Sequence, residues 1–108
     1  MSFEVFVTDP AFLNLQSYYK WWSVNRSDEQ AVRWREAFLE RIYSLEQMPS
    51  SHPLARENGK VPFELREMHF GLGSTATHRA VFRIEASAVH VLAVRHVAQH
   101  EIDPAELT

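Results

Sequence analysis

With 108 residues, a net charge of −3 and no cysteine, the chain has the size of one domain that buries its own core, so we expect a single domain over residues 1–108. The lack of cysteine excludes disulfides, thiolate metal sites and a cysteine nucleophile, and the acidic balance argues against a general nucleic-acid-binding surface. No run of about 20 apolar residues is present and the first residues do not resemble a signal peptide, so we expect a cytoplasmic protein without membrane contact.

The first quarter of the chain predicts a strand and a helix. Residues 3–7 favour β structure and predict a short strand. Asp9 suits a helix N-cap and Pro10 the first helical position, so we expect a helix from there to about Val24. Its expected buried stripe, at helical spacing, is Phe12, Leu15, Tyr19 and Trp22.

A second helix is predicted to start at a capping box, residues 27–30 (SDEQ), and to run to about Met48, before Pro49. Its apolar residues keep the three-to-four spacing throughout: Ala31, Trp34, Phe38, Ile42, Leu45 and Met48. Since only a few residues separate the two helices, they should form an antiparallel hairpin.

The second half of the chain predicts three strands after a loop at residues 49–60. Alternation over residues 61–70 predicts a strand whose parity shifts near Arg66 and Glu67, which suggests a bulge there. A second strand is predicted over residues 77–85. Residues 89–97 are apolar on both faces, as in a central strand, and the tail from Ala98 to Thr108 is polar.

The element order β-α-α-β-β-β predicts an α+β fold, an antiparallel sheet with the helix hairpin packed on one face. No helix remains for the other face of the sheet. We therefore expect that face to meet water, a partner or a ligand.

Three segments resemble strands of the RelE/ParE toxin superfamily, in the same order and behind a helix hairpin. Residues 63–70 (FELREMHF) are similar to its "ELR" strand, and residues 78–84 (HRAVFRI) to its "YRVLY" strand. Residues 89–96 (VHVLAVRH) are similar to its final strand, which ends in His. The resemblance implies a RelE/ParE-like fold and the toxin of a type II toxin–antitoxin system.

The resemblance also implies partners and two modes of growth inhibition. RelE-type members cleave mRNA on the ribosome without a metal, whereas ParE-type members poison DNA gyrase. Members of both branches bind a cognate antitoxin that wraps the toxin surface. Because this chain is acidic and lacks a basic pair after its last strand, both targets stay open, as does an inactive module that keeps only the antitoxin interface.

If the chain is an endoribonuclease, arginines would grip the phosphate and a histidine would act as acid or base. No metal or other cofactor is expected. The alternative for the arginines is a set of solvated side chains or of cross-strand partners of Glu64 and Glu85, and for the histidine a structural role at the sheet edge. The candidate catalytic residues are Arg66, Arg79, Arg83, Arg95 and His96.

Weaker signals come from other side chains. Glu67 and His69 are further candidates for the same chemistry, and His96 and His100 could share a face for a metal only if that segment were helical. Trp21 and Tyr18 fall off the predicted buried stripe and could form a patch for the antitoxin or for a second copy in a homodimer.

Overall fold

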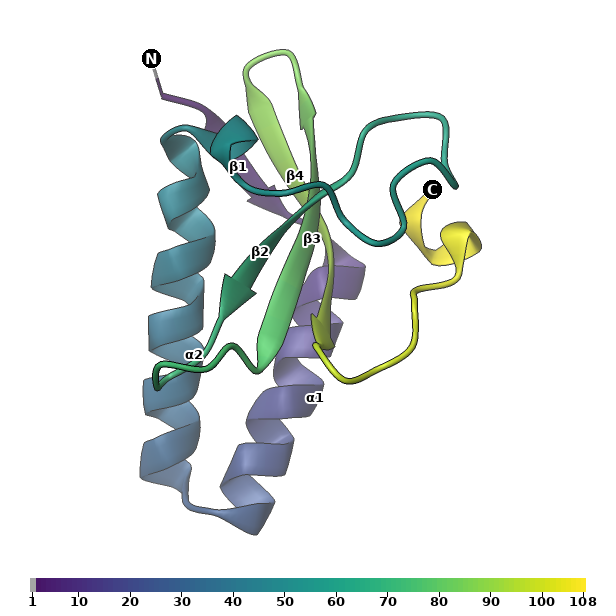
Figure 1. Ribbon diagram of the computed structural model, residues 1–108. Coiled ribbons are helices and arrows are strands. Elements are labelled where there is room, and N and C mark those ends of the chain that lie inside the picture. The colour runs from purple at the N-terminus through teal and green to yellow at the C-terminus, as the bar shows by residue number, and fades with distance from the viewer. Residues whose placement is uncertain (1) are drawn as a thin grey trace.

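A computed structural model describes residues 2–108 as a four-stranded sheet with two helices across one face (Figure 1). The predicted α+β class and the order β-α-α-β-β-β are confirmed. The helices are α1 (Asp9–Asn25) and α2 (Asp28–Tyr43), and the strands are β1 (Glu4–Val7), β2 (Arg66–Phe70), β3 (His78–Glu85) and β4 (Ala88–His96). Short 3-10 turns lie at Ser44–Glu46, Pro49–Ser51 and Pro104–Leu107.

The strand order across the sheet is β1-β4-β3-β2. Strands β2, β3 and β4 form the expected antiparallel meander, while β1 pairs parallel with β4, so the sheet is mixed. Strand β4 therefore has a neighbour on each side, in agreement with its apolar sequence on both faces.

Side-chain caps define both helix starts. Thr8, and not the predicted Asp9, is the N-cap of α1: its hydroxyl accepts from the backbone N–H of Ala11 and donates to the Val91 carbonyl in β4. The cap thus also fixes α1 to the sheet. Ser27 caps α2 as predicted, because its hydroxyl accepts from the N–H of Gln30 at 3.1 Å.

The buried stripe of α1 differs from the predicted one. Ala11 is fully buried whereas Phe12 is 45% exposed, and Tyr18 packs on the core. A small residue at position 11 lets the helix backbone approach the sheet closely, which turns Phe12 outward. Leu15 and Trp22 pack inward as expected.

Two predicted boundaries were wrong. Helix α2 ends at Tyr43, and Met48 is 73% exposed in a left-handed conformation (φ 49°) instead of closing the buried stripe. Strand β2 starts only at Arg66, because Pro62 has no N–H for a strand ladder and the N–H of Leu65 is bound by the Asn58 side chain.

The bulge lies in β4 and not near Arg66 and Glu67. Val81 pairs with Ala93 while Phe82 pairs with Val91, so Leu92 is the extra residue. Beyond Leu92 the alternation of β4 is shifted by one residue. This shift determines the face of the sheet on which Arg95 and His96, the last two residues of β4, lie.

Both faces of the sheet are covered, so the expectation of an open second face was wrong. On the helix side, Trp34, Phe38 and Ile42 of α2 are buried against Met68, Phe82 and other strand residues. On the other side, the loop before β2 and the tail after β4 contribute a second cluster (Figure 1). Its buried members are Ala55, Leu65, Val81, Ala93, Ile102 and Leu107.

Candidate functional site

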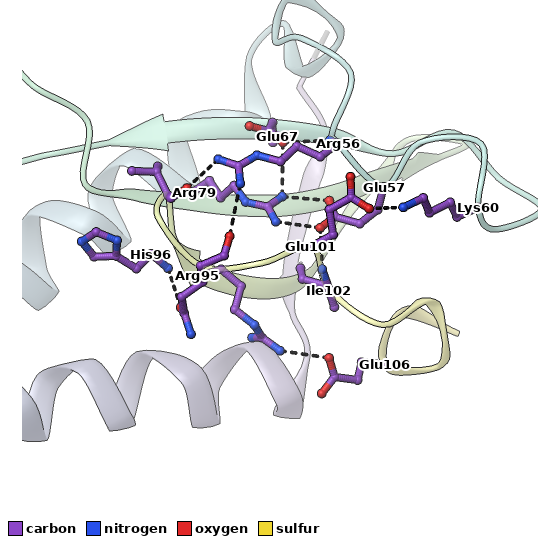
Figure 2. Close-up of polar contacts among 12 residues, drawn as sticks. Arg56, Glu57, Lys60, Glu67, Arg79, Arg95, His96, Glu101, Ile102 and Glu106 are labelled. Atoms are coloured by element: carbon purple, nitrogen blue, oxygen red, sulfur yellow. Dashed lines mark hydrogen bonds and ion pairs between the residues drawn. The ribbon is translucent and has the colours of Figure 1, made fainter.

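A buried ionic cluster lies beneath the tail, on the face of the sheet opposite the helices (Figure 2). Its centre is Arg79 of β3, whose side chain is 0% exposed. Its two terminal nitrogens donate to both carboxylate oxygens of Glu57, at 2.8 and 2.6 Å, and one also donates to Glu67 at 3.2 Å. The guanidinium is thus hydrogen-bonded to two carboxylates.

The same carboxylates hold two irregular segments against the sheet. Glu57 accepts from the N–H of Ile102 at 2.7 Å, which fixes the tail. Glu67 accepts from the N–H of Arg56 at 3.1 Å, which fixes the loop, and the Arg56 guanidinium donates to the carbonyls of Val97 and Gln99. Arg79 therefore lies where the loop, the tail and the sheet meet.

The protonation states of this cluster follow from its contacts. Burial by itself would raise the pKa of Glu57, but the hydrogen bonds from Arg79 and Ile102 outweigh it and lower the pKa to about 2. Burial would lower the pKa of Arg79, and the hydrogen bonds and charges of Glu57 and Glu67 instead raise it. Both groups are fully charged near neutral pH.

One branch of the cluster reaches the surface at His69. Its Nε2 lies 2.5 Å from the second carboxylate oxygen of Glu67, and its side chain is 46% exposed. The carboxylate therefore orients the imidazole at the edge strand β2.

Two further predicted residues share the face of Arg79 but turn to other partners. Arg95 lies opposite Arg79 in the ladder and bonds to the Asn14 side chain and to Glu106. Arg83 lies over the ring of Phe63 at 4.1 Å and pairs with Glu85 at 2.6 Å.

Arg66 and His96 fall on the helix side of the sheet. Arg66 lies opposite Phe82 of the helix-side core, pairs with Glu64 at 2.9 Å and donates to the His52 carbonyl at 2.6 Å. His96 lies opposite His78, with 5.1 Å between the ring centroids. Thus the bulge at Leu92 sends Arg95 to one face and His96 to the other.

The structure does not bring the five candidate residues together. Each of the four arginines pairs with a glutamate. Glu64 and Glu85 are partners of Arg66 and Arg83, but each pair joins residues two apart along the chain and not residues on neighbouring strands as the alternative interpretation expected. Catalytic roles for the five stay a prediction. Glu57 could not be identified from the sequence, because it stands in a polar loop 22 residues before Arg79.

Other expectations concerned metals and membranes. Residues 97–100 are not helical, so His96 and His100 do not share a helix face. Within residues 2–108, no three His, Asp or Glu side chains are grouped in a way that could hold a metal ion. No helix in the same range is long and apolar enough to cross a membrane.

Comparison with protein families identifies one family, and comparison with solved structures identifies a similar fold. A family model described as the ParE toxin of the type II toxin-antitoxin system parDE matches residues 5–101. No curated protein matches the sequence. The fold is similar to a chain of the chromosomal ParDE TA system from P. aeruginosa, with a TM-score of 0.72 and 20% identity over 89% of this chain and 97% of that chain.

Proposed function

This chain belongs to the ParE toxin family of type II toxin–antitoxin systems, and from that premise we propose that it arrests growth by binding DNA gyrase and not by cleaving mRNA. Membership of the family makes the chain the toxin of such a pair and supports a cognate antitoxin as its partner. Gyrase is the target that the resemblance to ParE-type members implies.

The observation that carries this choice is the burial of Arg79. Metal-free RNA cleavage needs cations that reach the reacting phosphate. Arg79 has no exposed surface and already meets two carboxylates, so a phosphate could reach it only if the loop and the tail both opened. The histidine and the remaining arginines lie on both faces of the sheet and do not surround one phosphate.

Purified protein mixed with gyrase and plasmid tests the proposal directly. We expect inhibited supercoiling and an accumulation of linear DNA once the reaction is stopped with detergent and protease. Intact supercoiling at a large excess of folded protein would contradict it.

Growth experiments test the RNA alternative. Cells that express the chain should stop growing, while primer extension shows no new ends in their mRNA. Arg66→Ala and Arg83→Ala should still arrest growth, as should the matched control Arg33→Ala, an exposed arginine of α2. Cuts in mRNA that disappear in Arg66→Ala or Arg83→Ala but persist in Arg33→Ala would establish cleavage instead.

A second candidate function, an inactive module that only binds antitoxin, is favoured by the net charge of −3 and by the ion-paired arginines. In that case folded protein would bind its antitoxin, yet neither arrest growth nor affect gyrase. Arrest of growth by the chain alone would exclude it.

A further inference from the structure

A hollow of about 530 Å³ opens between the C-terminal half of α1 and the adjacent ends of β3 and β4. Its walls are mostly aromatic: Tyr18, Trp21 and Trp22 from α1, with His78 and His96 from the strands. This volume lies within the range of small-molecule sites, about 300–1,000 Å³. The hollow is on the opposite side of the sheet from the Arg79 cluster.

The aromatic walls leave a planar surface free. Trp21 is 51% exposed and meets Trp22 edge to face, with 5.7 Å between the ring centroids and 88° between the planes. Tyr18 meets His78 edge to face at 4.7 Å, and its hydroxyl is fixed by the N–H of His96. These rings are ordered by each other, and the indole face of Trp21 has room for a stacked ring.

Two imidazoles give the hollow its polar groups. His78 is only 5% exposed, and its Nδ1 is bound to the Thr77 hydroxyl at 2.8 Å. Nδ1 of His96 accepts from the N–H of Ala98 at 3.0 Å. Within residues 2–108 neither Nε2 has a hydrogen-bond partner, although both rings line the hollow.

The hydrogen bonds of the two Nδ1 atoms leave the two Nε2 atoms for a ligand. Because Nδ1 of His96 accepts, its Nε2 carries the proton and donates. Burial, with the neighbouring His96, lowers the pKa of His78 to about 4, so this ring is neutral at pH 7. Because Nδ1 of His78 is bound to the Thr77 hydroxyl, Nε2 is the ring nitrogen of His78 that remains for a ligand.

The charge at the rim is positive. Arg26, the residue that follows α1, is exposed and is the one Lys, Arg, Asp or Glu side chain among the described residues that line the hollow. A cation beside a stacking surface is suited to an aromatic ligand that carries a phosphate.

We propose that this hollow binds the nucleobase of a nucleotide, stacked on Trp21, with its polar edge on Nε2 of His78 and of His96 and its phosphate beside Arg26. An apolar side chain of a partner protein would fill the same space but leave both Nε2 atoms without hydrogen bonds, and a buried polar group without a partner is costly. The site shares no residue with the Arg79 cluster and does not depend on the gyrase proposal.

Titration of the four ribonucleoside 5′-monophosphates, followed by calorimetry and by the indole N–H signals in NMR spectra, tests the proposal. We expect saturable binding that shifts the signals of Trp21 and Trp22 most, with a smaller change at Trp34, which is buried behind His78. Trp21→Ala should weaken binding about tenfold or more, because base stacking is lost. Arg26→Gln should weaken binding of monophosphates but not of nucleosides.

Controls separate binding from folding. Phe12→Ala, an exposed aromatic of the same helix outside the hollow, should leave affinity unchanged. His78→Phe keeps a ring but removes the polar edge and should weaken binding. A short single-stranded oligonucleotide that binds much more tightly than the monophosphates would identify a strand as the source of the base.

Two results would overturn the proposal. One is the absence of binding at millimolar nucleotide by folded wild-type protein, or binding that Trp21→Ala does not change. The other is antitoxin binding that Trp21→Ala weakens while no nucleotide binds at all, which would assign the hollow to an apolar side chain of the antitoxin.

Discussion

At the scale of single residues, Arg79 carries the clearest structural role in the molecule. A buried guanidinium between two carboxylates contributes little net stability compared with apolar residues, but removing one member leaves charge without compensation. Because its partners come from the loop and from β2, and because Glu57 also holds the tail, the effect spreads to both segments.

Arg79→Met should therefore lower the free energy of unfolding by about 3–5 kcal/mol, since Glu57 and Glu67 would remain buried and charged. Adding Glu57→Gln and Glu67→Gln to this variant should recover much of the loss, because the amide oxygens still accept from Ile102 and Arg56. Urea unfolding of the three proteins measures both effects. If Arg79→Met were as stable as the wild type, the structural role of Arg79 would be refuted.

The second prediction at this scale concerns His78 and acid. Its pKa is about 4 in the folded protein and 6.5 in the unfolded chain, so between these values only the unfolded chain takes up the proton. Stability should thus be full above pH 6.5 and fall as the pH drops toward 4, by about 2.5 kcal/mol at pH 4.5. The pKa of His52 is also lowered, first by burial and then by the charges of Arg41, His69 and Arg66. Its titration should therefore add to the loss of stability in acid.

Urea unfolding at pH 7 and at pH 4.5 checks this, with His78→Phe as the comparison. The variant should lose much of the difference between the two pH values and keep the part due to His52. Glu57 contributes little to this difference, since its pKa is 4.5 in the unfolded chain and about 2 in the folded protein, so most of its loss of stability falls below pH 4.5. An unchanged pH dependence in His78→Phe would contradict the assignment.

At the scale of elements, the tail acts as a layer of the structure although only Pro104–Leu107 is regular. Ile102 and Leu107 are each 3% exposed against the sheet. Ile102→Ala should cost about 2–4 kcal/mol, because it removes buried apolar volume from the second cluster.

The matched control for Ile102→Ala is Glu101→Ala. Glu101 pairs with Lys60 at the surface, and removal of an exposed ion pair should cost less than about 1 kcal/mol. Thermal unfolding and amide exchange of residue 102 compare the two. Equal stabilities would mean that the tail is not part of the cooperative fold.

The sequence predicted these elements best where a local signal sets them. Ser27 caps α2, and the spacing of Trp34, Phe38 and Ile42 identifies its buried face. The prediction was wrong where packing between distant elements determines the structure. Ala11 replaces Phe12 on the buried stripe because the helix approaches the sheet closely. No local pattern marks Leu92 as the bulge.

At the scale of the whole molecule, the covering of the second face was beyond sequence reasoning. Two apolar residues, Ile102 and Leu107, stand among polar ones and show no regular period. The candidate site was predictable only in part. The arginines could be identified from their strands, whereas Glu57, the partner of Arg79, comes from a loop that only the complete fold brings near.

Net charge supports a prediction at this scale too. Binding to duplex DNA depends on unpaired Lys and Arg that displace counterions. With a charge of −3 and its strand arginines paired to glutamates, the protein alone should not shift duplex DNA in a gel at physiological salt. Tight binding that weakens steeply with added salt would show a cationic surface that the ion pairs do not suggest.

The parallel pairing of β1 with β4 has a consequence for synthesis. The hydroxyl of Thr8, just after β1, bonds to a carbonyl 83 residues later, so the first strand can pair only after β4 has been made. Contacts this far apart along a chain form late and slowly. During synthesis the nascent protein therefore cannot complete its sheet until β4 has left the ribosome, so β1 stays without its pairing partner until the last strand of the sheet is available.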